Sequence, residues 1–366
     1  MSKEARILFI AVYLLVALGV VMTYSASAVY AQQVYGNSQY FLFRQVLYVI
    51  MGTFFLYVAA SIPIQFWKRH ARAFMLLSIA FLITVFVPVL GRTAGGAQRW
   101  IHLGPFNFQP AEFAKLAVCT YLADYLSRKM KIIKKGSVAV FFPPLALLGI
   151  ICGLILLQPD LGSCAFIFLM SAIMFFMVGI RLRYVMIAAT LFMPVLYMLV
   201  IRVPYRLNRV TAYLNPWNDP QGTGFQIIQS FLAYGLGGIK GVGIGQSTQK
   251  LFYLPSAYTD FIMSIIGEEL GLIGLLGVLV LYGVIFITGI QMAERTDHLF
   301  ERLLISVLTL SIVLQAMINI LVSTGLIPTK GLPLPFVSYG GTSIVLNLLA
   351  VGMLLSLDRS QTAGRR

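Results

Sequence analysis

Long apolar runs separated by short polar connections dominate the chain. Each run approaches the roughly 20 helical residues needed to cross a hydrocarbon core about 30 Å thick. Because backbone polar groups in lipid must be paired within the segment, these runs are expected to be helices, and the alternating pattern of an outer-membrane barrel is absent. Ten spans are predicted, to within several residues: 7–29, 41–61, 73–90, 109–127, 138–157, 162–180, 184–202, 261–291, 303–325 and 341–357.

Composition points to the same class. The 366 residues are 59% hydrophobic and only 11% charged, with a mean hydropathy of +0.88, whereas soluble domains carry about 25% charged residues. We therefore expect an all-α, polytopic integral membrane protein of about ten transmembrane helices. It should form a single domain, 1–366, with one long extracytoplasmic loop, about 203–260, between the seventh and eighth spans.

Lysine and arginine are distributed unevenly between the two sets of connections. Of 27 basic residues, 17 fall in the set that includes both termini. Cytoplasmic connections are rich in Lys and Arg, so both termini are predicted to be cytoplasmic. Eight basic residues lie on the outer side: Arg92, Arg99, Arg202, Arg206, Arg209, Lys240, Lys250 and Lys330. A basic outer surface suits an anionic ligand such as a phosphate ester, and it suits anionic lipid headgroups as well.

Asp260 is the strongest catalytic candidate. It lies in LPSAYTDFIMSIIGEELG, residues 254–271, where Thr259 is predicted to cap the eighth span. Asp260 would then occupy the first helical turn, where the helix dipole keeps a carboxylate ionised and available as a general base. The alternative is an aspartate that only starts the helix.

Arg99, Trp100 and Lys330 are candidates for substrate binding. Arg99 and Trp100 lie in the glycine-rich and proline-containing segment 91–112, which is not expected to be a regular helix. The tryptophan could stack on a sugar, with Arg99 on a phosphate, or it could belong to the interfacial aromatic belt. Lys330 lies in 324–341, where three prolines exclude a continuous helix. It suits a phosphate, although a lysine that extends to the headgroups is the competing interpretation.

Glu112 and Lys115 complete the polar candidates within the spans. Their i,i+3 spacing allows them to pair on one helix face, and ionisable groups in membranes usually face the bundle interior. A purely structural pair is equally compatible with the sequence. The glycine-rich stretch 235–245 follows no βαβ unit and lacks Gly-Lys-Ser/Thr, so it does not indicate a nucleotide site. No histidine cluster or CxxC spacing predicts a metal site.

Together these segments resemble the SEDS family of peptidoglycan glycosyltransferases, most closely its division branch, FtsW. The PTKG form, with its lysine, is more similar to that branch than to the elongation paralogue RodA, and a sporulation paralogue would look similar. The motifs are YSAS (24–27), GGAQRWIHLGPFNFQPAEFAK (95–115), QPDLG (158–162), YLNPWNDPQGTGFQIIQS (213–230), QKLFYLPSAYTDF (249–261), IIGEELG (265–271) and PTKGLPLPFVSYGG (328–341).

The resemblance implies a lipid II polymerase that makes β-1,4 glycan strands during cell division and releases undecaprenyl diphosphate. It implies Asp260 as the catalytic aspartate, with Trp100, Lys330 and Ser338 among the substrate-binding residues. The implied partners are a class B penicillin-binding protein, other division proteins and membrane lipid, but not nucleic acid. The implied location is the cytoplasmic membrane at the septum. Ser256 and Tyr258 depart from the usual Glu and His of the motif, which leaves the roles of those two positions open.

Two rival functions fit parts of the sequence. A flippase that moves the same lipid across the membrane would use the polar groups inside the spans, and a scaffold would need no accessible carboxylate. The concentration of candidate groups on the outer side favours the transferase. No cofactor is certain, and a divalent cation (Mg or Mn) sharing the diphosphate charge is an expectation without a defined site.

The predicted topology can be tested by labelling single cysteines with an impermeant thiol reagent in intact cells. Position 218, in the long loop, should be labelled, and position 132, in the basic connection, should not, because the excess of Lys and Arg marks the cytoplasmic side. The opposite labelling would reverse the orientation.

Overall fold

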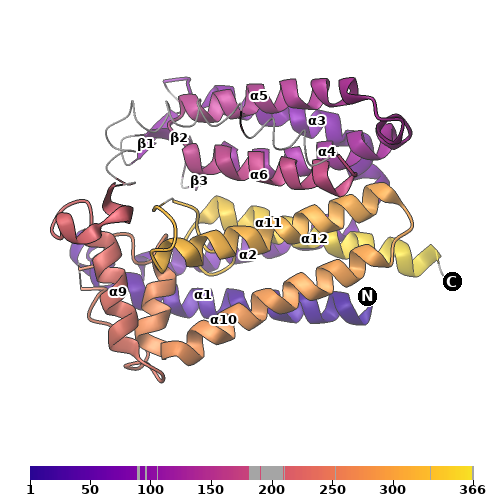
Figure 1. The fold of residues 1–366 in the computed structure, drawn as a ribbon. Helices are drawn as coiled ribbons and strands as arrows, with labels where there is room; N and C mark the ends of the chain where they lie inside the picture. Colours follow the sequence, from indigo (N-terminus) through magenta and orange to yellow (C-terminus); the bar gives the residue numbers. More distant parts are fainter. Residues whose placement is uncertain are drawn as a thin grey trace.

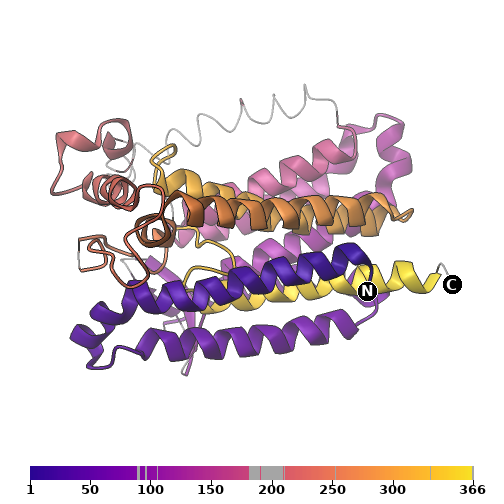
Figure 2. The same cartoon turned by 90° about the horizontal axis from the view of Figure 1, so that it is seen from below.

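Long helices run side by side as a bundle, and α9 and three short strands lie at one end (Figures 1 and 2). The computed structural model describes residues 1–88, 91–94, 97–104, 106–180, 190, 209, 211–251, 253–329 and 331–364. The α-helices are α1 (Lys3–Tyr35), α2 (Tyr40–Ser61), α3 (Ile64–Thr84), α4 (Pro110–Lys134), α5 (Phe142–Leu157), α6 (Leu161–Met177), α9 (Phe225–Gly237), α10 (Ile262–Glu294), α11 (Leu299–Ser323) and α12 (Gly341–Gly364). Two short 3₁₀ helices are Val138–Phe141 and Pro216–Asn218.

Nine of the ten predicted spans overlap with described helices, and the seventh, 184–202, lies outside the described residues except at position 190. By length and apolar composition, six of these helical segments can cross a membrane: Lys3–Tyr35, Tyr40–Ser61, Val138–Leu157, Ile262–Glu294, Leu299–Ser323 and Gly341–Asp358. The all-α membrane fold is therefore confirmed.

The start of the third span was predicted wrongly. Helix α3 begins at Ile64, directly after Pro63, rather than near 73. Lys68, Arg69 and Arg72 therefore lie inside the helix and not in a connection. These three charges lower the hydropathy of the first turns of α3, so the hydropathy pattern did not predict them as part of the span. The helix can include them because long basic side chains lie along apolar surface while their charged ends stay in water.

A small antiparallel sheet occupies most of segment 91–112, which the sequence predicted not to be a regular helix. Its strands are β1 (Gly91–Ala94), β2 (Ala97–Leu103) and β3 (Phe106–Phe108), in the order β1-β2-β3. Gly104, with a φ of 62°, sits in the short connection between β2 and β3. The sheet places Arg99 and Trp100 on its central strand, and α4 starts immediately after it.

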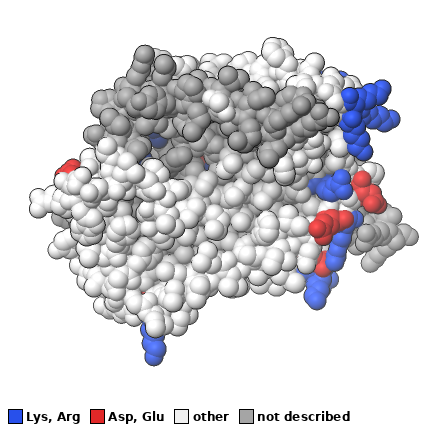
Figure 3. All heavy atoms as spheres, in the orientation of Figure 1, with Lys and Arg blue, Asp and Glu red and all other residues white. Residues whose placement is uncertain are grey.

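The two termini lie at the same end of the bundle, opposite α9 and the sheet (Figure 1). The backbone N–H of Ser2 donates to Asp358 Oδ2 (2.8 Å), and Arg295 at the end of α10 pairs with Glu4 of α1. On the face seen in Figure 3, charged side chains gather mainly at this end, and the described surface in the middle of the bundle carries almost none. We call the opposite end, which carries α9 and the sheet, the loop end.

Helix α10 is interrupted at Gly271, whose φ of 66° and ψ of −163° are not helical. In a continuous helix the amides of Leu272 and Ile273 would donate to the carbonyls of Glu268 and Glu269. The break removes both hydrogen bonds and leaves four backbone groups that need other partners. It also separates a short outer half-helix, 262–270, from the longer remainder of α10.

The loop that follows α9 fills this break. Its backbone groups take the places of the lost helical partners, in the manner of a paired strand. The four hydrogen bonds are Leu272 N to Gly238 O (2.9 Å), Ile273 N to Ile239 O (3.3 Å), Val242 N to Glu268 O (2.9 Å) and Gly243 N to Glu269 O (3.0 Å).

Three glycines make this contact possible. A Cβ atom at Gly237, Gly241 or Gly271 would lie 1.9, 2.2 or 2.3 Å from a backbone atom of the opposite segment. Backbone atoms cannot move aside as a flexible side chain can. The glycine-rich stretch 235–245 therefore serves close packing against α10.

Candidate functional site

Asp260 lies in the turn that precedes α10, a helix whose first residues lie at the loop end of the bundle (Figure 1). Its side chain is half-buried, and a Cβ atom at Gly331 would lie only 3.3 Å from its Oδ2. The carboxylate is thus packed against the segment 324–340, which connects α11 to α12. Two segments that are about 70 residues apart in the sequence meet at this point.

The predicted capping of this helix is wrong. Helix α10 begins at Ile262, its N-cap residue Phe261 makes no side-chain cap, and Thr259 Oγ1 donates to Ser256 O (3.2 Å) instead. Ser256 has a left-handed φ of 59°, and its carbonyl also accepts from Thr259 N and Phe261 N. A tight turn thus replaces the expected first helical turn, and Asp260 lies before the helix.

The ionisation of Asp260 depends on burial and on two arginines. Burial raises the pKa of Asp260 to about 6, while the positive charges of Arg209 and Arg99 act to lower it. A carboxyl with this pKa is still about nine-tenths ionised at pH 7. It is also a stronger base than an ordinary aspartate, so the helix dipole is not needed to explain an available base.

The backbone around Asp260 is fixed by hydrogen bonds from other elements. Asn319 of α11 donates through Nδ2 to Asp260 O and to Leu332 O, both at 2.9 Å. Ser338 Oγ donates to Thr259 O (2.6 Å) and accepts from Leu334 N (2.8 Å). Asn319 was missed by the sequence reasoning, although an asparagine in the middle of an apolar span is a detectable signal.

Arg99 and Arg209 bring two further segments to the site. Arg99 donates through Nε to Gln158 O (3.1 Å) and through a terminal nitrogen to Pro159 O, so it joins β2 to the turn between α5 and α6. Arg209 donates to Thr329 O (3.0 Å). Both guanidinium groups influence Asp260 electrostatically, which places positive charge beside the carboxylate.

Three further predicted residues, Lys330, Trp100 and Ser338, differ in what the structure shows of them. Lys330 lies outside the described residues, while its neighbour Gly331 contacts Asp260. Trp100 is half-buried on β2, directly after Arg99. Ser338 belongs to the site through its bond to Thr259, as described above.

Glu112 and Lys115 form a buried ion pair inside the bundle, with 2.7 Å between Nζ and Oε1. Lys115 Nζ also donates to Gln315 Oε1 (2.7 Å), and Gln315 Nε2 donates to Pro333 O (2.9 Å). This chain of contacts supports the segment 324–340 from the bundle interior. A role of Glu112 and Lys115 in substrate binding stays a prediction.

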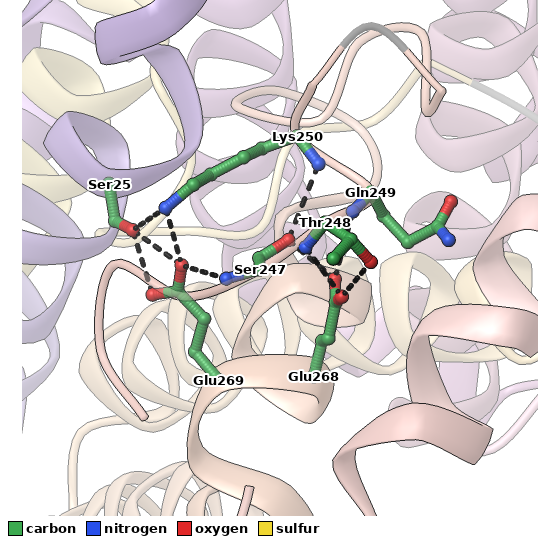
Figure 4. A network of polar contacts seen from close by, with 7 residues as sticks. All are labelled: Ser25, Ser247, Thr248, Gln249, Lys250, Glu268 and Glu269. Carbon is green, nitrogen blue, oxygen red and sulfur yellow. Dashed lines mark hydrogen bonds and ion pairs between the residues drawn. The ribbon is translucent and has the colours of Figure 1, made fainter. Parts of the chain in front are cut away.

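A second polar cluster lies beneath the long loop (Figure 4). Glu268 and Glu269 of the outer half-helix are fully buried and accept hydrogen bonds from the segment 247–250 and from Ser25 of α1. Lys250 was predicted among the outer cations available to a phosphate. Its side chain is instead 8% exposed and pairs with Glu269 at 3.0 Å, so it is not free to bind an anion.

Comparison with known proteins supports the resemblance drawn from the motifs. A sequence model of cell cycle proteins of the FtsW, RodA and SpoVE type matches residues 5–363. The chain is 44% identical to a probable peptidoglycan glycosyltransferase FtsW of Geobacter sulfurreducens, covering 94% of this chain and 92% of the relative. It is 40% identical to the stage V sporulation protein E of Bacillus subtilis, covering 96% of each.

Solved structures share the fold over nearly the whole chain. A chain from a study of how a peptidoglycan synthase complex coordinates polymerization and crosslinking matches with a TM-score of 0.80, 29% identity and 97% of both chains covered. The rod shape determining protein RodA of Thermus thermophilus matches with a TM-score of 0.71 and 26% identity, covering 97% of this chain and 96% of that one. The chain therefore belongs to the FtsW, RodA and SpoVE family of cell cycle proteins.

Proposed function

We propose that this protein is a peptidoglycan glycosyltransferase of the division type, which polymerises lipid II into β-1,4 glycan strands at the outer face of the cytoplasmic membrane. Family membership and the names of its relatives support the activity. The single observation that carries the mechanism is the half-buried carboxylate of Asp260, with its raised pKa, beside Arg99 and Arg209.

The proposed chemistry needs one base. The 4-hydroxyl of the acceptor sugar attacks the anomeric carbon of the donor and loses its proton to Asp260. The bond from that carbon to the diphosphate breaks, and undecaprenyl diphosphate leaves. A single displacement on an α-linked donor inverts the configuration and gives the β product, so no carboxylate nucleophile is required. General base catalysis is most effective when the pKa lies near the working pH.

Cations stabilise the leaving diphosphate in this proposal. Arg99 and Arg209 supply positive charge beside Asp260, and Lys330, predicted from the sequence, would add to it. Electrostatic stabilisation of a developing anion is usually a large contribution to catalysis. Trp100, next to Arg99, would stack on a sugar ring. A divalent cation (Mg or Mn) would be held mainly by the diphosphate, since such ions commonly combine one or two carboxylates with substrate phosphates.

The transporter alternative gains no support from the polar groups inside the bundle. Glu112 and Lys115 pair with each other, and the cavity beside them measures about 30 Å³, which is room for one or two water molecules. Glu268 and Glu269 are likewise satisfied by protein donors. These contacts account for the polar residues that the transporter hypothesis invoked.

The proposal extends to a partner and a location. A single-span class B penicillin-binding protein would bring the crosslinking activity to the septum, with both termini of the present chain in the cytoplasm. Helix α10 offers a surface for a membrane helix, since Gly277 has open space beside it and lies between the exposed Ile273 and Val280. Small residues allow such close helix contact.

Replacement of Asp260 by Asn should abolish polymerisation while preserving the fold. Asn keeps the shape but removes the basicity, so the rate should fall by about 10²–10⁴-fold. The measurement is the amount and length of glycan made from labelled lipid II by purified protein. Asp219→Asn, in the same long loop, is the matched control and should stay active. Near-normal polymerisation by the Asp260 variant would reduce Asp260 to a structural residue.

The rate should also depend on pH through Asp260. The base is active only when ionised, so a pKa of about 6 places half-maximal activity near pH 6, with loss on the acid side. At pH 5 the rate should be about tenfold below its plateau. Initial rates between pH 4.5 and 8, with stability checked at each pH, test this. A profile that is flat down to pH 5 would contradict the raised pKa.

Binding of the partner should depend on the face of α10 that carries Gly277. The change Gly277→Leu should lower co-purification of the penicillin-binding protein in mild detergent, because a large side chain prevents close helix approach. Gly283, which also has open space beside it but is six residues further along the helix, provides the control as Gly283→Leu. Equal recovery with both variants would move the interface elsewhere.

A further inference from the structure

Two adjacent buried carboxylates lie on the outer half-helix of α10, eight and nine residues after Asp260. Glu268 is 1% exposed and Glu269 0%. Burial of a carboxylate is costly unless hydrogen bonds or opposite charges compensate it. In this protein both side chains are bound by groups that come from outside the half-helix. Figure 4 shows Glu269 extending toward Ser25 and Lys250, and Glu268 toward Ser247 and Thr248.

Glu268 is held by residues 247–249 of the loop. It accepts from the hydroxyl of Ser247, from the amide and hydroxyl of Thr248 (2.8 and 2.9 Å) and from the amide of Gln249 (3.4 Å). Four donors from three successive residues thus converge on one carboxylate. The loop is thereby attached to the half-helix a few residues beyond the point where its backbone fills the break in α10.

Glu269 connects three elements. It accepts from Ser25 Oγ of α1 (2.6 and 2.7 Å to its two oxygens), from Ser247 N (3.3 Å) and from Lys250 Nζ (3.0 Å). Lys250 Nζ donates to Ser25 Oγ as well (3.3 Å). A triangle of Ser25, Lys250 and Glu269 therefore ties α1, the long loop and the outer half-helix together.

The half-helix needs such contacts because Gly271 cuts it off from the rest of α10. A continuous 33-residue helix would hold its own end rigidly, but a segment of nine residues, 262–270, cannot rely on helical hydrogen bonds across the break. Asp260 lies two residues before this segment. Any tilt of the half-helix would therefore move the carboxylate relative to Gly331, Arg99 and Arg209.

We propose that Lys250 and Glu269 are positioning residues for the transferase reaction: their ion pair, shared with Ser25, fixes the outer half-helix so that Asp260 meets the acceptor hydroxyl. This inference rests on the role of Asp260 proposed above. It assigns Lys250 a structural partner inside the protein in place of a phosphate. The pair acts through the half-helix and does not touch the reacting atoms.

The test compares Lys250→Met, Glu269→Gln and the double variant with wild-type protein, using labelled lipid II and correcting for the folded fraction measured by size exclusion. Each single variant should lower kcat by about tenfold to a hundredfold, since small displacements of a catalytic group have effects of this size, with KM within about twofold. The double variant removes both buried charges and should recover thermal stability but not kcat.

The pH dependence of the rate distinguishes a displaced Asp260 from a protein that is only less stable, because lower stability alone would not change the midpoint of the profile. The pKa of Asp260 reflects burial balanced against Arg99 and Arg209, and Gly331 is packed beside its carboxylate. A displaced carboxylate changes that balance, so the midpoint near pH 6 should shift by about half a unit or more. If the charge variants fold poorly, Ser25→Ala can be measured in their place. It leaves the ion pair of Lys250 and Glu269 intact and should change kcat and the pH midpoint in the same way, but less.

Glu4→Gln is the matched control, since the pair of Glu4 with Arg295 joins the same two helices, α1 and α10, at the opposite end of the bundle. It should leave kcat and the pH midpoint unchanged. Normal kcat in the Lys250 and Glu269 variants would overturn the inference, as would a double variant that regains both stability and kcat. Asp260→Asn is measured in parallel: if it is active, the proposed base is wrong, whereas an inactive Asp260→Asn beside normal Lys250 variants refutes only the positioning role.

Discussion

The pairing of backbone groups across the break in α10 is the constraint on which the loop end of the molecule depends. In a membrane protein, each interrupted helical hydrogen bond must find another partner within the protein. The loop after α9 provides four such partners at the break. Because the loop is held there, the polar cluster of Figure 4 can form, and the outer half-helix gains a fixed direction.

The candidate site is also held together by a small number of hydrogen bonds to backbone groups. Asn319, Ser338 and Arg99 donate mainly to backbone carbonyls, so each side chain fixes one irregular segment against another. In the described residues of the proline-rich segment after α11 and of the turn before α10, the backbone forms no helix or strand. Their relative position is set by these few donors, and the carboxylate of Asp260 is left with a neighbour, Gly331, that has no side chain.

Much of the fold was predictable because lipid imposes a simple length and polarity rule on each span. The rule failed at α3, where Lys68 and its basic neighbours lie within the helix, and it could not detect the sheet, whose strands are three to seven residues long. Asp260 was identified from its motif, but the capping role of Thr259 was wrong because Ser256 adopts a left-handed turn. Lys250 was misassigned because sequence position does not show that Glu269 lies beside it.

The backbone pairing at the break in α10 also constrains the number of residues in the loop after α9. Hydrogen bonds in register join residues 238, 239, 242 and 243 to residues 268–273, and the side-chain contacts of 247–250 follow at once. Insertion or deletion of one residue between 238 and 250 would move the loop donors that follow it out of register with their acceptors on α10. Engineered insertions such as epitope tags should therefore be placed before α9, outside this region of paired backbone and side-chain contacts.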